Sequence, residues 1–125
     1  MLRNVLLAAG LAIAGTVLIG AAPAVAGYGA IAFDEATGRY GFAWNEETAT
    51  KAEEIAVRDC KTKGCKVVIP VGPRECAALA SSEIGKIAWG GSKRPSLDAA
   101  KLRALENCQK RSSGKCEIRG SECNK

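Results

Sequence analysis

The chain of 125 residues contains no histidine, only one methionine and only two residues each of Phe, Tyr and Trp. The missing histidine removes the usual general base near neutral pH, the Ser-His and Cys-His nucleophile systems, and the commonest metal ligand. The six cysteines include no Cys-x-x-Cys pair of the kind found in redox and zinc sites. We therefore expect no metal, no cofactor and no catalytic residues, and a protein that is not an enzyme.

Carboxylates are the remaining groups that could support catalysis. Asp34 lies in a predicted turn, and Glu46 and Glu47 precede a predicted helix. Acidic residues at such positions are normally solvated, because turns and helix N-termini favour them there. A small secreted hydrolase or lytic factor that uses these carboxylates is the alternative interpretation of the sequence.

Residues 1–26 are typical of a secretory signal peptide. A weakly positive start precedes the apolar run Val5–Ile19, and Ala24-Val25-Ala26 supplies a small-x-small cleavage site. An uncleaved membrane anchor is the competing interpretation, since the apolar stretch is nearly long enough to span a bilayer. We expect cleavage near Ala26, no transmembrane segment after it, and a secreted or periplasmic protein whose single mature domain covers 27–125.

The chain contains an internal duplication. Three residues of one predicted helix recur 48 positions later in the same order, so that Ala52, Ala56 and Cys60 correspond to Ala100, Ala104 and Cys108. All six cysteines follow the leader, as is typical of small exported proteins in which disulfides supplement a small core. We predict two repeats, residues 28–71 and 76–123.

Each repeat begins with a predicted β-hairpin. In the first repeat, strands at 28–33 and 40–44 flank a turn at 34–38, and in the second, strands at 76–81 and 86–90 flank a turn at 82–85. Aromatic residues alternate with small ones on the returning strands. Aromatic side chains can bind bases or sugars, although a place in the core explains them more simply: Tyr28, Tyr40, Phe42, Trp44 and Trp89.

Each repeat continues with a predicted helix and a last strand. Thr48 or Thr50 caps the first helix, Ala49 lies on its apolar face, and Gly64 ends it before a strand at 66–71. The second helix opens at Pro95-Ser96, and its last strand covers 116–119. This order predicts an α+β fold in which two tandem ββαβ repeats form one compact disulfide-stabilised domain.

The spacing of the cysteines alone cannot decide which of them form disulfides with each other. The repeat reduces the number of plausible pairings. Since equivalent positions should form equivalent bonds, we favour Cys60–Cys65 and Cys108–Cys116, which leaves Cys76–Cys123. Bonds between the repeats, such as Cys60 to Cys108 if the helices lie side by side, are the alternative.

Charge is unevenly distributed along the chain. The formal net charge is +5; residues 27–75 carry 7 basic and 8 acidic side chains, whereas residues 76–125 carry 10 and 5. This asymmetry favours an anionic partner, although a solvated face also explains it. The basic residues that we single out for partner binding are Lys93, Arg94, Lys110, Arg111 and Lys115.

The order of several short motifs resembles a known family. These motifs are Tyr28–Ala32, the Gly38-x-Tyr40-Gly41 strand, Cys65–Val68, Cys76–Ala80, Ala88-Trp89-Gly90, and the two Ala-rich helices that end in cysteine. Together they resemble the small exported bacterial proteins grouped as domain of unknown function 4189. The resemblance covers most of 28–123 and implies a compact, disulfide-bonded, exported domain, and it brings no catalytic residues. Residues 119–122 are more polar than the last strand of that family, so we expect this strand to be short.

Three functions are compatible with the sequence. The first is a non-enzymatic exported binding module, whose partner is an unknown protein or an anionic component of the envelope or host, with no nucleic acid expected. The second is the carboxylate-dependent hydrolase, and the third is a structural envelope protein. We expect a monomer or a weak dimer.

The small residues of the helix seams lead to a prediction about packing. Ala56→Leu and Ala104→Leu each place a larger side chain where a helix approaches its sheet, so each should lower the free energy of unfolding by about 1–3 kcal/mol. Thermal melts of the two variants measure this, and unchanged melting would show that these faces are exposed.

Overall fold

The computed structural model describes residues 27–83 and 87–125. The predicted leader and part of the second predicted turn therefore lie outside the described residues. The elements are β1 (Tyr28–Phe33), β2 (Tyr40–Glu46), α2 (Ala49–Cys60), β3 (Lys66–Val71), β4 (Cys76–Ser82), β5 (Ala88–Arg94), α3 (Leu97–Gln109) and β6 (Glu117–Cys123). Among the described residues, neither helix has the length and apolar character needed to cross a membrane.

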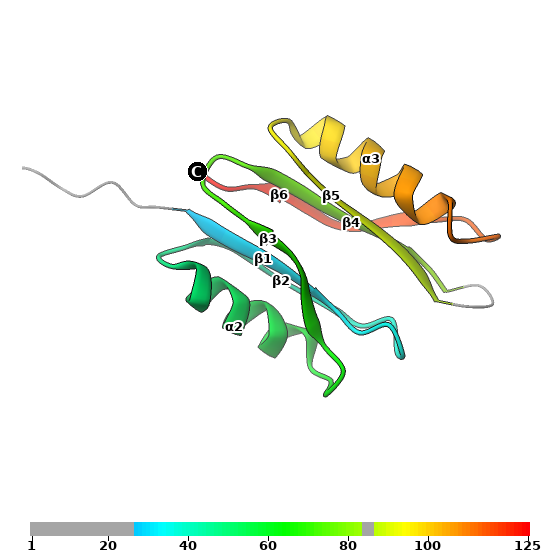
Figure 1. The fold of residues 1–125 in the computed structure, drawn as a ribbon, viewed down its shortest axis with the longest axis horizontal. Helices are drawn as coiled ribbons and strands as arrows, with labels where there is room; N and C mark the ends of the chain where they lie inside the picture. Colours follow the sequence, from blue (N-terminus) through cyan, green and yellow to red (C-terminus); the bar gives the residue numbers. More distant parts are fainter. Residues whose placement is uncertain (1–26, 84–86) are drawn as a thin grey trace, which may run out of the picture.

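The strands form two antiparallel sheets, one from each repeat. The order is β2-β1-β3 in the first sheet and β5-β4-β6 in the second. One helix covers the outer face of each sheet, and the inner faces pack against each other (Figure 1). The predicted α+β fold of two ββαβ repeats is confirmed.

The N-cap of the first helix is one of the two predicted residues, whereas its C-terminal end differs from the prediction. The Thr48 side chain accepts a hydrogen bond from the Lys51 N–H, so Thr48 is the N-cap and Thr50 lies inside the helix. Lys61 adopts a left-handed conformation at φ 72° and ends the helix three residues before Gly64. Ala49, predicted on the apolar face, is exposed, because the helix packs on the sheet only from Ala52 onward.

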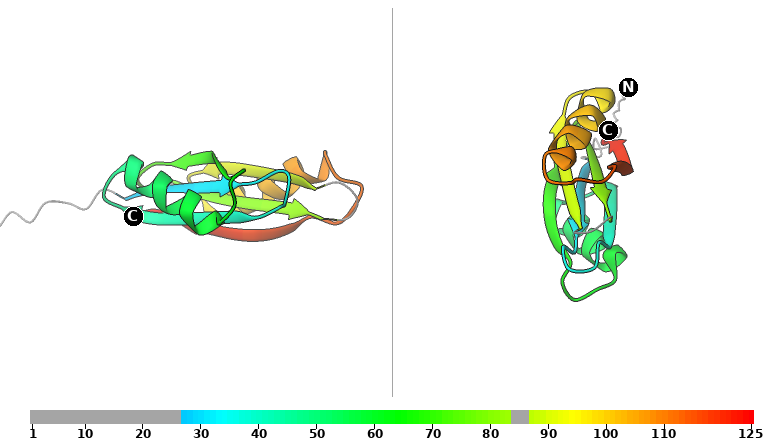
Figure 2. Two further views of the ribbon diagram at one scale, coloured as in Figure 1. Left: turned by 90° about the horizontal axis from the view of Figure 1, so that it is seen from below. Right: turned by 90° about the vertical axis from the view of Figure 1, so that its right-hand side faces the viewer.

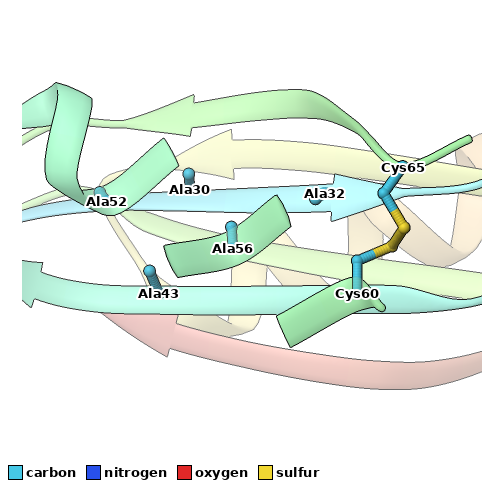
Figure 3. Packing of buried hydrophobic residues seen from close by; sticks show 7 residues of the cluster. All are labelled: Ala30, Ala32, Ala43, Ala52, Ala56, Cys60 and Cys65. Atoms are coloured by element: carbon cyan, nitrogen blue, oxygen red, sulfur yellow. A yellow bond between two sulfur atoms is a disulfide. The ribbon is translucent and has the colours of Figure 1, made fainter. Parts of the chain in front are cut away.

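Small side chains fill the layer between each helix and its sheet. Gly41 and Gly90 approach the helix backbones so closely that a Cβ on either would overlap helix atoms. This close approach explains the alanine seams. Figure 3 shows the first layer, which contains Ala30, Ala32, Ala43, Ala52, Ala56, Cys60 and Cys65.

Large side chains fill the layer between the two sheets. Ile31, Phe33 and Leu79 are almost completely buried there. Strand β3 lies over β5, and β2 lies over β6. Each repeat thus has a small-residue face for its helix and a large-residue face for the other repeat.

Two glycines of the second repeat receive large side chains of the first. Ile31 pairs with Phe42 and Ile69 on its neighbouring strands, and the equivalent Leu79 pairs with Gly91 and Gly120. A Cβ on Gly120 would overlap the ring of Phe42, and a Cβ on Gly91 would overlap the Ile69 side chain. The two inner faces are therefore complementary: protrusions on the first repeat match hollows on the second.

The strands of the second repeat extend beyond the predicted bounds. Strand β6 runs to Cys123, not to residue 119, because Gly120 accommodates Phe42 and the polar residues around it still pair with β4. Strand β5 continues to Arg94. Ser82, predicted in a turn, is the buried last residue of β4. The prediction ended these strands early because the residues beyond them are small or polar, although their backbones pair within the sheet.

The disulfides link Cys60 to Cys65, Cys76 to Cys123 and Cys108 to Cys116. These are the pairs that the repeat symmetry favours, and no bond joins the two helices. The two local bonds close the loop after each helix, while the third joins directly paired residues of β4 and β6. Three disulfides indicate an oxidising, extracytoplasmic location.

Asp34 connects the first hairpin to the loop after α2. It was predicted to be solvated in a turn, yet it is 3% exposed. Its carboxylate accepts hydrogen bonds from the Thr62 hydroxyl at 2.6 Å and the Ala36 N–H at 2.9 Å. These bonds, the Thr62 bond above all, hold the pKa of Asp34 below its ordinary value of 3.8.

The glycine contacts predict a specific pattern of stability. Gly120 and Gly91 do not have positive φ angles, so alanine fits the backbone at both positions and only packing opposes it. Gly120→Ala should lower the free energy of unfolding by about 1–3 kcal/mol, because the Phe42 ring cannot move away easily. Gly91→Ala should cost less, since the end of the Ile69 side chain can rotate.

A double-mutant cycle tests the Gly120 contact directly. Phe42→Leu makes room for the new methyl group, so Gly120→Ala should cost less in the Phe42→Leu background than in the wild type. Chemical denaturation of the four proteins measures this coupling. Strictly additive effects would show that the ring and the glycine do not meet.

Asp34 predicts a dependence of stability on pH. Because its folded pKa lies below its unfolded value, its contribution is complete above the unfolded pKa and is lost as the pH falls through the folded pKa. The difference in melting temperature between the wild type and Asp34→Asn should therefore be largest near pH 7 and should shrink toward pH 2. Glu47→Gln, at an exposed position, serves as the control; an equal pH trend in both variants would contradict the role of Asp34.

Candidate functional site

Four connections of the fold point toward one end of the molecule, which we call the hairpin end. They are the β1–β2 and β4–β5 hairpins and the loops that follow α2 and α3. The two helices run in the same direction along the molecule, and their C-termini point toward this end (Figures 1 and 2). The short link between the repeats and the described chain ends lie at the opposite end. The hairpin end is therefore where loop residues of both repeats come together.

Three cations of each repeat lie at the hairpin end, in the loop after the helix or at the first residue of the strand that follows it. Both sets are exposed at their side chains, and among the described residues none of these cations lies within 4.0 Å of a carboxylate oxygen. The C-terminal ends of the helices favour positive charge nearby. The six residues, which we call the loop cations, are Lys61, Lys63, Lys66, Lys110, Arg111 and Lys115.

The basic residues predicted from the sequence do not form one patch. Lys93 and Arg94 end β5, next to the start of α3, and so lie at the end of the molecule opposite to Lys110, Arg111 and Lys115. Lys93 also forms an ion pair with Glu75 at 3.5 Å. Nearness in sequence had grouped them, whereas the length of α3 separates them.

A hollow of about 300 Å³ surrounds Trp89 at the hairpin end, lined by Glu35, Ile87, Ala88, Trp89 and Arg111. The indole N–H of Trp89 donates to Glu35 at 3.0 Å, across the boundary between the repeats. The Arg111 guanidinium lies 5.3 Å from the centre of the indole ring and donates to the Trp89 carbonyl at 3.0 Å. One aromatic ring, one guanidinium and one carboxylate are thus fixed together.

A second hollow, of about 380 Å³, surrounds Tyr40 at the same end, lined by Thr37, Arg39, Tyr40 and Glu83. Tyr40 is 36% exposed, the most exposed aromatic residue that the structure describes. Arg39 is held in place because its Nε donates to the Cys60 carbonyl at 3.3 Å. This hollow contains the same three kinds of group as the first.

The remaining candidates lie elsewhere. Tyr28 packs on the helix side of its sheet, and Phe42 and Trp44 lie between the sheets. Glu46 and Glu47 lie at the end of β2 opposite to Asp34, so these carboxylates do not form one group. Sequence reasoning did not single out Arg39, Glu83, Lys61, Lys63 or Lys66, although three basic residues after each helix-end cysteine are visible in the sequence.

Comparisons with known proteins support the resemblance proposed from the sequence. Uncharacterized protein Rv1813c of Mycobacterium tuberculosis and uncharacterized protein Mb1843c of Mycobacterium bovis are each 33% identical over 85 residues, which is 68% of this chain and 52% of each relative. The chain thus spans about half the length of these curated relatives.

The fold is also similar to a solved structure. The NMR structure of Rv1813c from Mycobacterium tuberculosis is 25% identical in sequence, has a TM-score of 0.55, and covers 94% of this chain and 98% of that chain. The model of the family described as domain of unknown function DUF4189 matches residues 28–123, which contain both sheets and both helices. The chain belongs to the DUF4189 family.

Proposed function

We propose that this protein is an exported, non-enzymatic binding module whose hairpin end binds an anionic component of the cell envelope or of a host. The observation that carries the proposal is the presence of three loop cations from each repeat at the same end of the molecule. Two loops far apart in sequence direct six positive groups toward one end, and in the described part of the chain no carboxylate pairs with them. Such an arrangement attracts an anionic surface and increases the rate of association.

The disulfides favour binding through these loops. Cys60–Cys65 and Cys108–Cys116 close the loops that carry the cations. The Asp34 carboxylate further ties the first loop to its hairpin through Thr62. A loop held in one conformation loses less entropy on binding than a mobile one, so more of the contact energy contributes to affinity.

The carboxylates support binding better than catalysis. Asp34 accepts two hydrogen bonds and has a lowered pKa, so it is poorly suited to act as a general acid. Glu46 and Glu47 lie at the other end of the molecule. The hydrolase hypothesis can be tested separately. Turnover of a glycan or peptide that disappears in Asp34→Asn or Glu46→Gln would favour a hydrolase over a binding module.

An exported location fits this function. The three disulfides are suited to an oxidising compartment, and the leader predicted at 1–26 would deliver the chain there. We propose that the mature protein is secreted or periplasmic and meets its partner in that compartment.

Charge reversal at the hairpin end tests the proposed function. The variant changes Lys61, Lys63, Lys110 and Lys115 to Glu and leaves out Arg111, which contacts Trp89. Capture of an anionic partner from envelope or host extracts by the oxidised protein should fall at least tenfold, because four attractive charges become repulsive. Mass spectrometry of the captured material measures the effect.

A control variant reverses Lys93 and Arg94 at the opposite end, a change of four charge units against eight in the first variant. It should retain capture close to that of the wild type. Losses in proportion to the number of reversed charges would indicate a nonspecific effect of net charge, and unchanged capture in both variants would remove the basic surface as the binding site.

A further inference from the structure

We propose that the Tyr40 and Trp89 hollows are two equivalent subsites for an acidic polysaccharide, each holding one sugar ring of the same chain. The proposal rests on the proposed function, because it assigns the chemical class of the anionic partner of the hairpin end. It is carried by the composition of the two hollows and by the symmetry between them.

The internal symmetry that relates the two repeats also relates the two hollows. Tyr40 pairs with Phe33 and Trp89 pairs with Ser81, at equivalent positions of the two hairpins. Glu35 lines the Trp89 hollow, and its equivalent Glu83 lines the Tyr40 hollow. Each hollow therefore combines the aromatic residue of one repeat with the glutamate of the other. In a twofold arrangement, a contact between two positions recurs with the repeats exchanged, so the aromatic residue and the glutamate of both hollows follow from one geometry. The guanidiniums come from different places, since Arg39 precedes β2 and Arg111 follows α3.

The groups in each hollow suit a sugar better than other ligands. In the Tyr40 hollow, the exposed ring offers an apolar surface to the C–H face of a pyranose. In the Trp89 hollow, Arg111 lies over the indole ring and Phe33 packs against it, so the Glu35 carboxylate and the Arg111 guanidinium bind the sugar there through its hydroxyls. The volumes, about 380 and 300 Å³, lie at the lower end of the range for small-ligand sites. A single-stranded nucleic acid would also use aromatic and basic residues, so it is compared directly with the polysaccharide in the test below.

The cations near the hollows are the reason to expect an acidic ligand. The loop cations lie on the same end of the molecule, and Arg111 belongs both to them and to the Trp89 hollow. A chain in which neutral and acidic sugars alternate could place neutral rings in the hollows and carboxylates beside the cations. Two subsites on one polymer also raise affinity through effective concentration, without further contacts.

Binding to hyaluronan, a chain of alternating glucuronate and N-acetylglucosamine, tests the proposal. Calorimetry with the intact oxidised protein should show saturable binding to a hyaluronan octasaccharide, and weaker binding to a disaccharide, which contains one neutral ring. In NMR spectra the indole N–H signal of Trp89 should shift, because that N–H bonds to Glu35 inside the hollow. Neutral dextran, polyphosphate and single-stranded oligothymidine of similar length are the comparison ligands.

Isosteric variants separate the hollows from the general positive charge. Glu35→Gln and Glu83→Gln remove a charged acceptor from each hollow while keeping its shape, and each should weaken octasaccharide binding about tenfold. The double variant should bind the octasaccharide no more tightly than the disaccharide. Glu47→Gln, the same change at the opposite end, should leave binding unchanged, and circular dichroism checks that all variants fold.

The outcomes distinguish the two proposals. If polyphosphate binds as tightly as hyaluronan, and the Gln variants bind normally while the four-lysine reversal abolishes binding, the sugar subsites are wrong and the anionic binding module remains. Tighter binding of oligothymidine than of hyaluronan would overturn the sugar assignment in favour of a nucleic acid. If neither hyaluronan nor polyphosphate binds, both proposals fail. Dextran binding that depends on the glutamates but not on the lysines would overturn the requirement for an acidic ligand.

Discussion

The contact between the two inner sheet faces is the interaction on which the rest of the structure depends. A three-stranded sheet with one helix buries only one of its faces, and here the helix-facing layer consists mainly of alanine, glycine and cysteine. The larger apolar residues, including Ile31, Phe33 and Leu79, lie on the other face of each sheet and are buried only by the other repeat. Neither repeat therefore has a complete core alone. The same contact aligns the hairpins, so it also builds both hollows.

Much of this architecture could be predicted from the sequence, because duplication and cysteine spacing are local signals. The shared positions of Cys60 and Cys108 indicated both repeats and the pairing within them. The helices were found from their alanine seams, although their ends were less certain: Lys61 ends α2 in a left-handed conformation that a glycine was expected to provide. Helix termini depend on single-residue geometry that periodicity does not encode.

The arrangement of the repeats relative to each other could not be predicted in this way. Glycine is more typical of loops than of strands, so the sequence did not place Gly91 and Gly120 in strands. Their presence there is explained only by the opposing side chains of Ile69 and Phe42. Likewise, the five basic residues chosen from the sequence divide between two ends, because a helix of 13 residues separates them. The hydrogen bond from Trp89 to Glu35 spans 54 positions. Such contacts follow from the packing of one sheet on the other, which no short motif records.

The complementary inner faces have a consequence for the evolution of the gene. If recombination copied the first repeat over the second, Phe42 and Ile69 would each meet a large side chain in place of a glycine. If it copied the second over the first, the middle of the molecule would lose both side chains and contain a void. Sequence exchange between the two halves of the gene would therefore destabilise the fold in either direction. The two halves are expected to keep diverging, while each remains matched to the other.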